Sequence, residues 1–325
     1  MFWFFLLLVL CSQVFAGQPQ LRLLPLAHTY SIVALDPETG EMGGAVQSHW
    51  FSVGSVVLWA EAGVGVVATQ SLVNVSFGPR GLALMKAGKS PQEALDELLA
   101  SDEGRDYRQV ALIDTKGNVA TWTGPKCIPE AGHANGKNYS VQANLMLKNT
   151  VWPAMEKAFL AAKGPLAERM VAALEAAQAE GGDIRGKQSA ALVVVRQKAT
   201  GKPWEDKLID LRVEDHPEPV KELKRLLKLH RAYQHMNAGD MAIEKGDVEG
   251  ALREYGAAEA MFPHNLEMKY WHAVSLVNVG RLAEALPIFH TIFQQDANWK
   301  TLTPRLVPIG LLKASPDQLK QIMQQ

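Results

Sequence analysis

Three hydroxyl side chains near the start of the chain could take part in catalysis: Thr29 as a nucleophile, and Ser31 and Ser48 in binding a substrate or an oxyanion. The stretch "HTYSIVALDPETGEMGGAVQSHW", residues 28–50, alternates apolar and polar residues on both sides of "PETG", and it predicts a β-hairpin. Thr29 and Ser31 share one face of the first strand, and Ser48 lies near the end of the second strand. Thr29 is either an ordinary strand hydroxyl or a nucleophile that is released when the preceding chain is cut away.

A second polar cluster, "EGGDIRGKQSAAL", joins the predicted end of a helix to a buried strand. Asp183 and Arg185 can pair across this turn. The planar fork of a guanidinium group also suits a substrate carboxylate. The two interpretations are a structural Asp–Arg pair that ties helix to sheet, and a substrate-binding site.

The composition bounds the class of protein. The chain has 325 residues, of which 47% are hydrophobic and 21% charged, enough to bury a large core, and its length suggests two domains. The formal net charge is -1, so the chain lacks the basic surface that nucleic-acid binding needs. We therefore expect no nucleic-acid partner.

The first sixteen residues, "MFWFFLLLVLCSQVFA", have the apolar core and small final residue of a signal peptide. Cleavage near Ala16 predicts export, to the periplasm or the extracellular space, and no stable membrane span afterwards. An uncleaved anchor and a lipoprotein attached through Cys11 are the alternatives. Residues 17–28 then form a short lead segment in front of Thr29.

The region 29–215 mixes strands and helices without a regular βαβ order. Two strands are expected in "SVGSVVLWAEAGVGVVATQS" and a hairpin in "RQVALIDTKGNVATWTG". A helix should begin after Ser90, with Glu93 placed for a capping box. Two further helices, "VWPAMEKAFLAAK" and "PLAERMVAALEAAQAE", precede the strands "SAALVVVRQ" and "DKLIDLRVED". This order predicts a layered α+β domain.

The remaining residues, 217–325, contain a repeat of thirty-four residues. The segments 232–265 and 266–299 align Gly246 with Gly280, Ala251 with Ala285 and Tyr255 with Phe289. This period and these positions resemble two tetratricopeptide repeats, which are paired helices that need neighbours to bury their apolar faces. The region is expected either to hold a protein partner or to be a purely structural appendix, joined to the first domain at Pro217–Pro219.

Several blocks of the first domain resemble a bacterial family catalogued as domain of unknown function 1028. They are "TYSIVALDPETGEMGGAVQS", "VGSVVLWAEAGVGVVATQS", "RQVALIDTKGNVATWTG" and "GGDIRGKQSAALVVV", in this order within residues 29–213. That family is in turn similar to the N-terminal nucleophile (Ntn) hydrolases. The resemblance implies a four-layer αββα sandwich and, less directly, hydrolysis of an amide bond.

The implied chemistry makes Thr29 the catalytic residue. A threonine at a true amino terminus has an α-amine, with a pKa of about 7.7 to 8.0, beside its own hydroxyl, and the amine can accept the hydroxyl proton. Gln70 and Asn74 are candidate oxyanion donors by residue type. Cleavage after Ala16 leaves twelve residues in front of Thr29, whose nitrogen is then an amide and cannot be a base. The mechanism therefore requires a second cut, after His28.

Cofactor chemistry has little support in the sequence. The histidines lack metal-ligand spacing, and signal removal leaves Cys127 as the one cysteine, so we expect no metal and no cofactor. Two hypotheses follow. One is an exported hydrolase that acts on a small amide or peptide and docks a partner through its repeats. The other is a non-catalytic envelope binding or scaffold protein with the same two regions.

Overall fold

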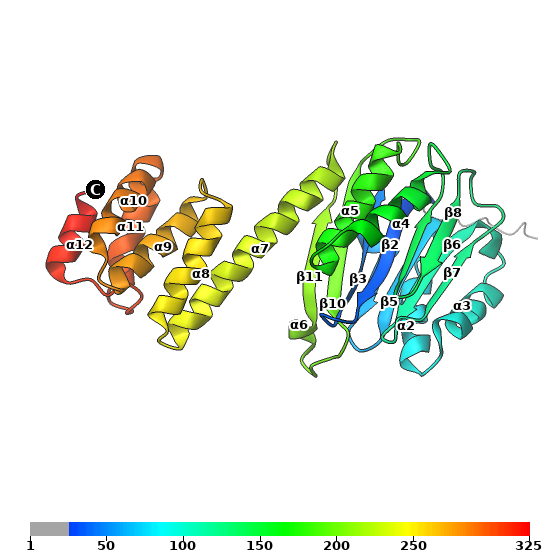
Figure 1. Ribbon diagram of the computed structural model, residues 1–325, viewed down its shortest axis with the longest axis horizontal. Coiled ribbons are helices and arrows are strands. Elements are labelled where there is room, and N and C mark those ends of the chain that lie inside the picture. The colour runs from blue at the N-terminus through cyan, green and yellow to red at the C-terminus, as the bar shows by residue number, and fades with distance from the viewer. Residues whose placement is uncertain (1–25) are drawn as a thin grey trace, which may run out of the picture.

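The computed structural model describes residues 26–325. The expected signal peptide, and the lead segment up to residue 25, lie outside this range. The described chain is an α+β protein with antiparallel sheets in its first part and a region of helices in its second (Figure 1). Among the described helices, none combines the length and apolar character needed to cross a membrane.

Two antiparallel sheets build the first part. The six-stranded sheet has the order β11 (Lys207–Val213), β10 (Ser189–Arg196), β3 (Glu41–Ser48), β2 (Thr29–Asp36), β9 (Tyr139–Ala143) and β8 (Gly132–Gly136). The five-stranded sheet has the order β1 (Leu26–Ala27), β5 (Gly65–Leu72), β6 (Arg108–Asp114) and β7 (Val119–Thr123), and β4 (Leu58–Glu61) also pairs with β5. The expected hairpin is confirmed, because β2 pairs with β3 from Thr29 opposite Ser48 to Asp36 opposite Glu41.

Helices cover the outer face of each sheet. They are α2 (Phe77–Lys86) and α3 (Pro91–Ala100) on the five-stranded sheet, and α4 (Val151–Ala161) and α5 (Leu166–Ala179) on the six-stranded sheet (Figure 1). Successive side chains of β2 point to opposite faces of the sheet, so this strand contributes to two cores. Ile32 and Ala34 pack with α4 and α5, whereas Val33 and Leu35 pack in the apolar layer between the sheets.

Local sequence signals explain several boundaries. The Ser90 side chain accepts a hydrogen bond from the Glu93 amide, and Glu93 caps the Ser90 amide in return, so the expected capping box is confirmed. The strand expected from Ser52 onward begins later, at Leu58, because Gly54–Val57 forms the one-turn helix α1. Two further short helices are η1 (Arg105–Tyr107) and α6 (Pro203–Asp206).

The long helix α7 (Pro219–Glu244) belongs to both parts of the protein. Its first half contributes Val220, Leu223 and Leu227 to the core shared by α4, α5 and the six-stranded sheet. Its second half packs against α8 (Val248–Met261) through Ala232 and Met236. The joint expected at Pro217–Pro219 therefore starts a helix that runs on from one core into the next (Figure 1).

The remaining helices follow α8 in sequence. They are α9 (Leu266–Asn278), α10 (Leu282–Gln295), α11 (Ala297–Leu302), η2 (Thr303–Leu306) and α12 (Pro316–Met323). Ala251, Ala285 and Phe289 are fully buried, and Tyr255 is nearly so. These two pairs occupy matching positions of the thirty-four-residue period, where a small residue lets two helices approach and an aromatic ring fills the space between them.

Candidate functional site

A buried polar cluster fills one end of the layer between the two sheets, where β2 begins. Thr29 and Ser31 point into this layer from β2, on the same strand face as Val33. Both hydroxyl-bearing residues are completely buried. The site expected from the spacing of Thr29 and Ser31 is therefore present as a shared face, and polar residues from both sheets surround it.

The Thr29 side chain contacts the residues that precede it in the chain. Its Oγ1 donates a hydrogen bond of 2.6 Å to the carbonyl oxygen of Ala27. Strand β1 places Ala27 opposite Ser71 at the end of β5. The Thr29 nitrogen is a peptide amide here, because the chain continues through His28.

The carbonyl oxygen of His28, which belongs to the peptide bond in front of Thr29, accepts two side-chain hydrogen bonds. Ser48 Oγ donates one at 2.5 Å, and Arg185 Nη2 donates the other at 2.8 Å. A hydroxyl and a guanidinium group therefore polarise this carbonyl from two separate strands or turns. Three donors or acceptors chosen from the sequence, Thr29, Ser48 and Arg185, meet at one peptide bond.

Asp183 holds Arg185 in this position. Arg185 Nε lies 3.0 Å from Asp183 Oδ1, and Arg185 Nη2 lies 2.7 Å from Asp183 Oδ2, which is a two-pronged contact. The carboxylate is nearly buried and also accepts a hydrogen bond from the His49 amide. The pair expected across this turn is present, and its guanidinium also reaches the chain before Thr29.

One serine and three glutamine side chains form the floor of the site. Ser31 Oγ donates to Gln70 Oε1 and accepts from Gln142 Nε2, both at 2.6 Å. Gln70 Nε2 donates to the Thr29 carbonyl oxygen at 3.3 Å and to Gln109 Oε1 at 2.7 Å. Gln70 therefore contacts the main chain of Thr29 rather than the carbonyl of His28.

Asn144 links this floor to the residues in front of Thr29. Its Nδ2 donates to Gln109 Oε1 at 2.9 Å and to the Thr29 carbonyl oxygen at 3.4 Å. Its Oδ1 lies 2.9 Å from Nδ1 of His28, so the imidazole donates this bond. Burial lowers the pKa of His28, although the Asn144 hydrogen bond raises it in part, and the nearby Arg185 charge lowers it further. The imidazole is therefore neutral near pH 7.

Asn74, the other candidate oxyanion donor, lies apart from this cluster. Its Nδ2 donates to Asp102 Oδ2 at 3.2 Å, and its Oδ1 accepts from the Ser76 hydroxyl at 2.8 Å. These bonds hold the turn that leads into α2. Asp102 in turn pairs with Arg108 at 2.7 Å.

Sequence reasoning missed His28, Gln109, Gln142 and Asn144. A signal was available in "YSVQAN", where Ser140, Gln142 and Asn144 alternate with small or apolar residues. Polar residues on one face of a strand usually indicate solvent, but here that face looks into the layer between the sheets, and Gln142 and Asn144 are completely buried.

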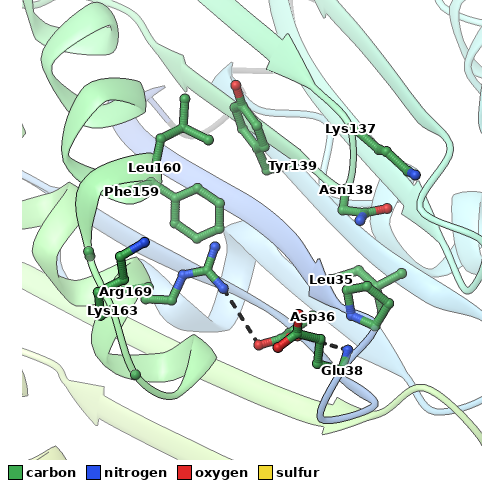
Figure 2. Close-up of a pocket in the computed structure, with 13 residues that line it drawn as sticks. Leu35, Asp36, Glu38, Lys137, Asn138, Tyr139, Phe159, Leu160, Lys163 and Arg169 are labelled. Carbon is green, nitrogen blue, oxygen red and sulfur yellow. Dashed lines mark hydrogen bonds and ion pairs between the residues drawn. The ribbon is translucent and has the colours of Figure 1, made fainter.

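Two cavities of the described chain lie away from Thr29. One of about 360 Å³ opens at the other end of β2, where Asp36 pairs with Arg169 at 3.5 Å and the Arg169 guanidinium carbon lies 4.6 Å from the centre of the Phe159 ring (Figure 2). Another of about 360 Å³ lies among the C-terminal helices. Residues 26–325 hold no group of three or more His, Cys, Asp and Glu side chains placed for a metal ion.

Comparison with known proteins places the chain in a family. A family described as one of unknown function (DUF1028) matches residues 29–223. The crystal structure of protein SPO2555 from Silicibacter pomeroyi, assigned to the same family, is similar with a TM-score of 0.56 and 32% identity. That likeness covers 62% of this chain and 88% of the other. No curated protein matches the chain. The match over residues 29–223 shows that the chain belongs to the DUF1028 family of unknown function.

Proposed function

We propose that this protein is an amide-bond hydrolase whose nucleophile is Thr29, exposed as the amino terminus by a cut after His28. One observation carries the proposal: the carbonyl of the His28–Thr29 peptide bond accepts hydrogen bonds from Ser48 and Arg185. Two donors on one carbonyl oxygen are what a tetrahedral oxyanion needs. The arrangement of helices, sheet, sheet and helices supports the likeness to Ntn hydrolases.

Cleavage of the His28–Thr29 peptide bond needs no reagent other than water. The Thr29 hydroxyl oxygen attacks the His28 carbonyl carbon, and Ser48 and Arg185 donate to the oxygen that becomes negative. The carbon–nitrogen bond then breaks, the hydroxyl proton passes to the Thr29 nitrogen, and His28 is left as an ester on Thr29. Water hydrolyses this ester, which gives the His28 carboxylate, a free hydroxyl and a free α-amine.

Turnover repeats the same steps on a substrate amide. The α-amine of Thr29 accepts the hydroxyl proton and later gives it to the leaving amine. Ser48 and Arg185 serve as the oxyanion donors, in place of Gln70 and Asn74. Gln70 and Asn144 position the nucleophile, because both donate to the carbonyl oxygen of Thr29.

The test combines intact mass with activity. Wild-type chain should acquire an amino terminus at Thr29, whereas Thr29→Ala should keep the preceding residues, and Thr29→Ser should be cut because serine supplies the same hydroxyl. Thr39→Ala, in the β2–β3 turn, is the matched control. A chain made to begin at Thr29 should hydrolyse members of a panel that contains both small amides and peptides. A verified Thr29 terminus without activity on any of them would overturn the proposal.

A second candidate function is binding by the helical region, which we propose to be tetratricopeptide-like. It is favoured by a cavity of about 360 Å³ lined by residues of α7, α8 and α9, among them Asp240, Trp271 and Ser275. The Ser275 hydroxyl is buried and has no hydrogen-bond partner among the described residues. A peptide that fills this cavity should quench Trp271 fluorescence, and Trp271→Phe should report whether that signal arises there. No quenching by any peptide in a broad library would count against this function.

The proposed location is outside the cytoplasm, with export directed by residues 1–16. Fractionation of cells that make the full chain should recover it in the periplasm or the medium. Intact mass would then show a terminus at Gly17 or, after the second cut, at Thr29. Recovery of the whole chain with Met1 in the cytoplasm would contradict export.

A further inference from the structure

The residues directly before Thr29 cover a short stretch of one edge of the five-stranded sheet. Strand β5 has β6 along one edge, and β4 and β1 share the other. Strand β4 pairs with residues 65–68 of β5, and β1 pairs with residues 71–72. On the edge away from β6, the end of β5 therefore has no strand partner in the described chain other than β1. Without β1, the backbone groups of Ser71 and Leu72 would form an open strand edge.

The same short segment fits the site in detail. Ala27 is completely buried, so only a small side chain has room two residues before the nucleophile's nitrogen. His28 is only 2% exposed, and its side chain hydrogen-bonds to Asn144. Ser71, opposite Ala27, has a φ of 74°, a left-handed conformation that costs a non-glycine residue energy and is found most often at functional sites.

We propose that the substrate of this site is an extended peptide, rather than a small free amide, and that residues 26–28 stand where its acyl side binds. This inference rests on the proposed function of Thr29. The peptide adds to β5 as a strand opposite Ser71 and Leu72, as extended peptides do at other exposed sheet edges. The substrate has a small residue at the position that Ala27 occupies. At the position of His28 it has a side chain that hydrogen-bonds to Asn144. The bond that follows is cleaved.

Hydrolysis of this peptide follows the same bond changes as cleavage of the His28–Thr29 peptide bond. The Thr29 oxygen bonds to the carbonyl carbon that lies between Ser48 and Arg185, and the substrate carbon–nitrogen bond breaks. The leaving amine takes the proton that the Thr29 α-amine accepted. Water then releases the peptide carboxylate from the ester, and the hydroxyl regains its proton.

Binding can be tested separately from catalysis. The probe is the peptide QLRLLPLAH, which repeats residues 20–28 with a free carboxylate and a fluorescent label at its amino end. The protein is the chain from residue 29 to 325 carrying Thr29→Ala, so no turnover is needed. Fluorescence anisotropy should show saturable binding, and methylation of the two peptide nitrogens of the Leu and Ala before the final His should weaken it at least about tenfold, because strand pairing is blocked.

Hydrolysis then tests selectivity. The Thr29-terminal chain should cleave the coumarin amide of this peptide with a kcat/KM at least about tenfold above that of acetyl-His coumarin amide. A peptide ending in Phe should have a higher KM than one ending in His, since Phe cannot bond Asn144. Binding without any hydrolysis would uphold the peptide site and remove the proposed function. Equal rates on acetyl-His and the peptide, or no peptide binding by a chain with normal circular dichroism, would overturn this inference and leave the hydrolase proposal in place.

Discussion

Nη2 of Arg185 lies 2.8 Å from the carbonyl oxygen of His28, although 157 residues separate the two in sequence. The same nitrogen lies 2.7 Å from the Asp183 carboxylate. A guanidinium group held in this way can polarise one particular peptide bond, because its fork is fixed by the carboxylate before any substrate arrives.

Replacing Arg185 by Lys should slow the appearance of the Thr29 terminus by about 10² to 10³-fold, because lysine lacks the planar fork with which Arg185 holds both Asp183 oxygens while it reaches the His28 carbonyl. The measurement is a time course of intact mass. Arg212→Lys is the matched control, since Arg212 also pairs with an aspartate, Asp210, but at an exposed position. An unchanged rate in Arg185→Lys would show that this guanidinium has only a structural role.

The uncut chain should lose stability as the pH falls from about 7 towards 5, partly through His28. Burial lowers the pKa of His28 in the folded chain, so the unfolded chain binds its proton at a higher pH. Stability from this group is complete above the unfolded pKa of about 6.5 and is lost as the pH falls through the folded pKa. Burial also lowers the pKa of His133 and His230, which therefore add to the same trend.

Urea midpoints of Thr29→Ala, in which the segment before residue 29 is retained, would measure this dependence. Adding His28→Gln should reduce the slope of the urea midpoint against pH, because glutamine can still donate to Asn144 but does not titrate. The same slope in both proteins would assign the effect to the other histidines.

Gln47→Met should raise the free energy of unfolding by about 1 kcal/mol. Gln47 lies in β3 opposite Tyr30 and is completely buried, and neither polar atom of its side chain has a hydrogen-bond partner among the described residues. Methionine has a similar volume and needs no partner. Gln92→Met, on the exposed face of α3, should change the urea midpoint little. Destabilisation by Gln47→Met alone would indicate a partner such as a buried water.

Gly65→Val should destabilise the two-sheet part of the protein by more than about 1 kcal/mol. A Cβ at Gly65 would lie 2.4 Å from the main-chain oxygen of Ile113, on the neighbouring strand β6, which cannot turn aside as a side chain could. Gly256→Ala in α8 is the comparison, because the nearest atom would be 3.5 Å away and alanine favours a helix. Denaturant midpoints that move equally in both variants would contradict this explanation.

The fragment 217–325 should show helical circular dichroism but should also self-associate, because Leu223 and Leu227 of α7 lose the core that covers them in the full chain. Replacing both by Lys should leave the spectrum helical and make the fragment monomeric in sedimentation. A monomeric unmodified fragment would show that this face of α7 can be covered from within the helical region.

The sequence predicted individual helices and strands better than it predicted the contacts between distant elements. The β2–β3 hairpin and the capping box at Ser90 depend on neighbours in the chain, and both were predictable from residue type and spacing. The site depends on contacts between distant strands. Gln70, Gln109 and Asn144 come from three segments, and nothing in any one of them shows that their polar faces turn towards Thr29. The register between two sheets is set by packing, which a single sequence pattern does not contain.

Helix α7 also determines how motion passes between the two parts of the protein. It spans 26 residues, or about 39 Å at the usual rise, and no loop interrupts it between the core around Leu223 and the core around Met236. A swing of the helical region cannot occur by rotation about a flexible linker and must instead bend a hydrogen-bonded rod. A force applied by anything bound to the C-terminal helices would therefore act as torque on β10 and β11, against which α7 packs.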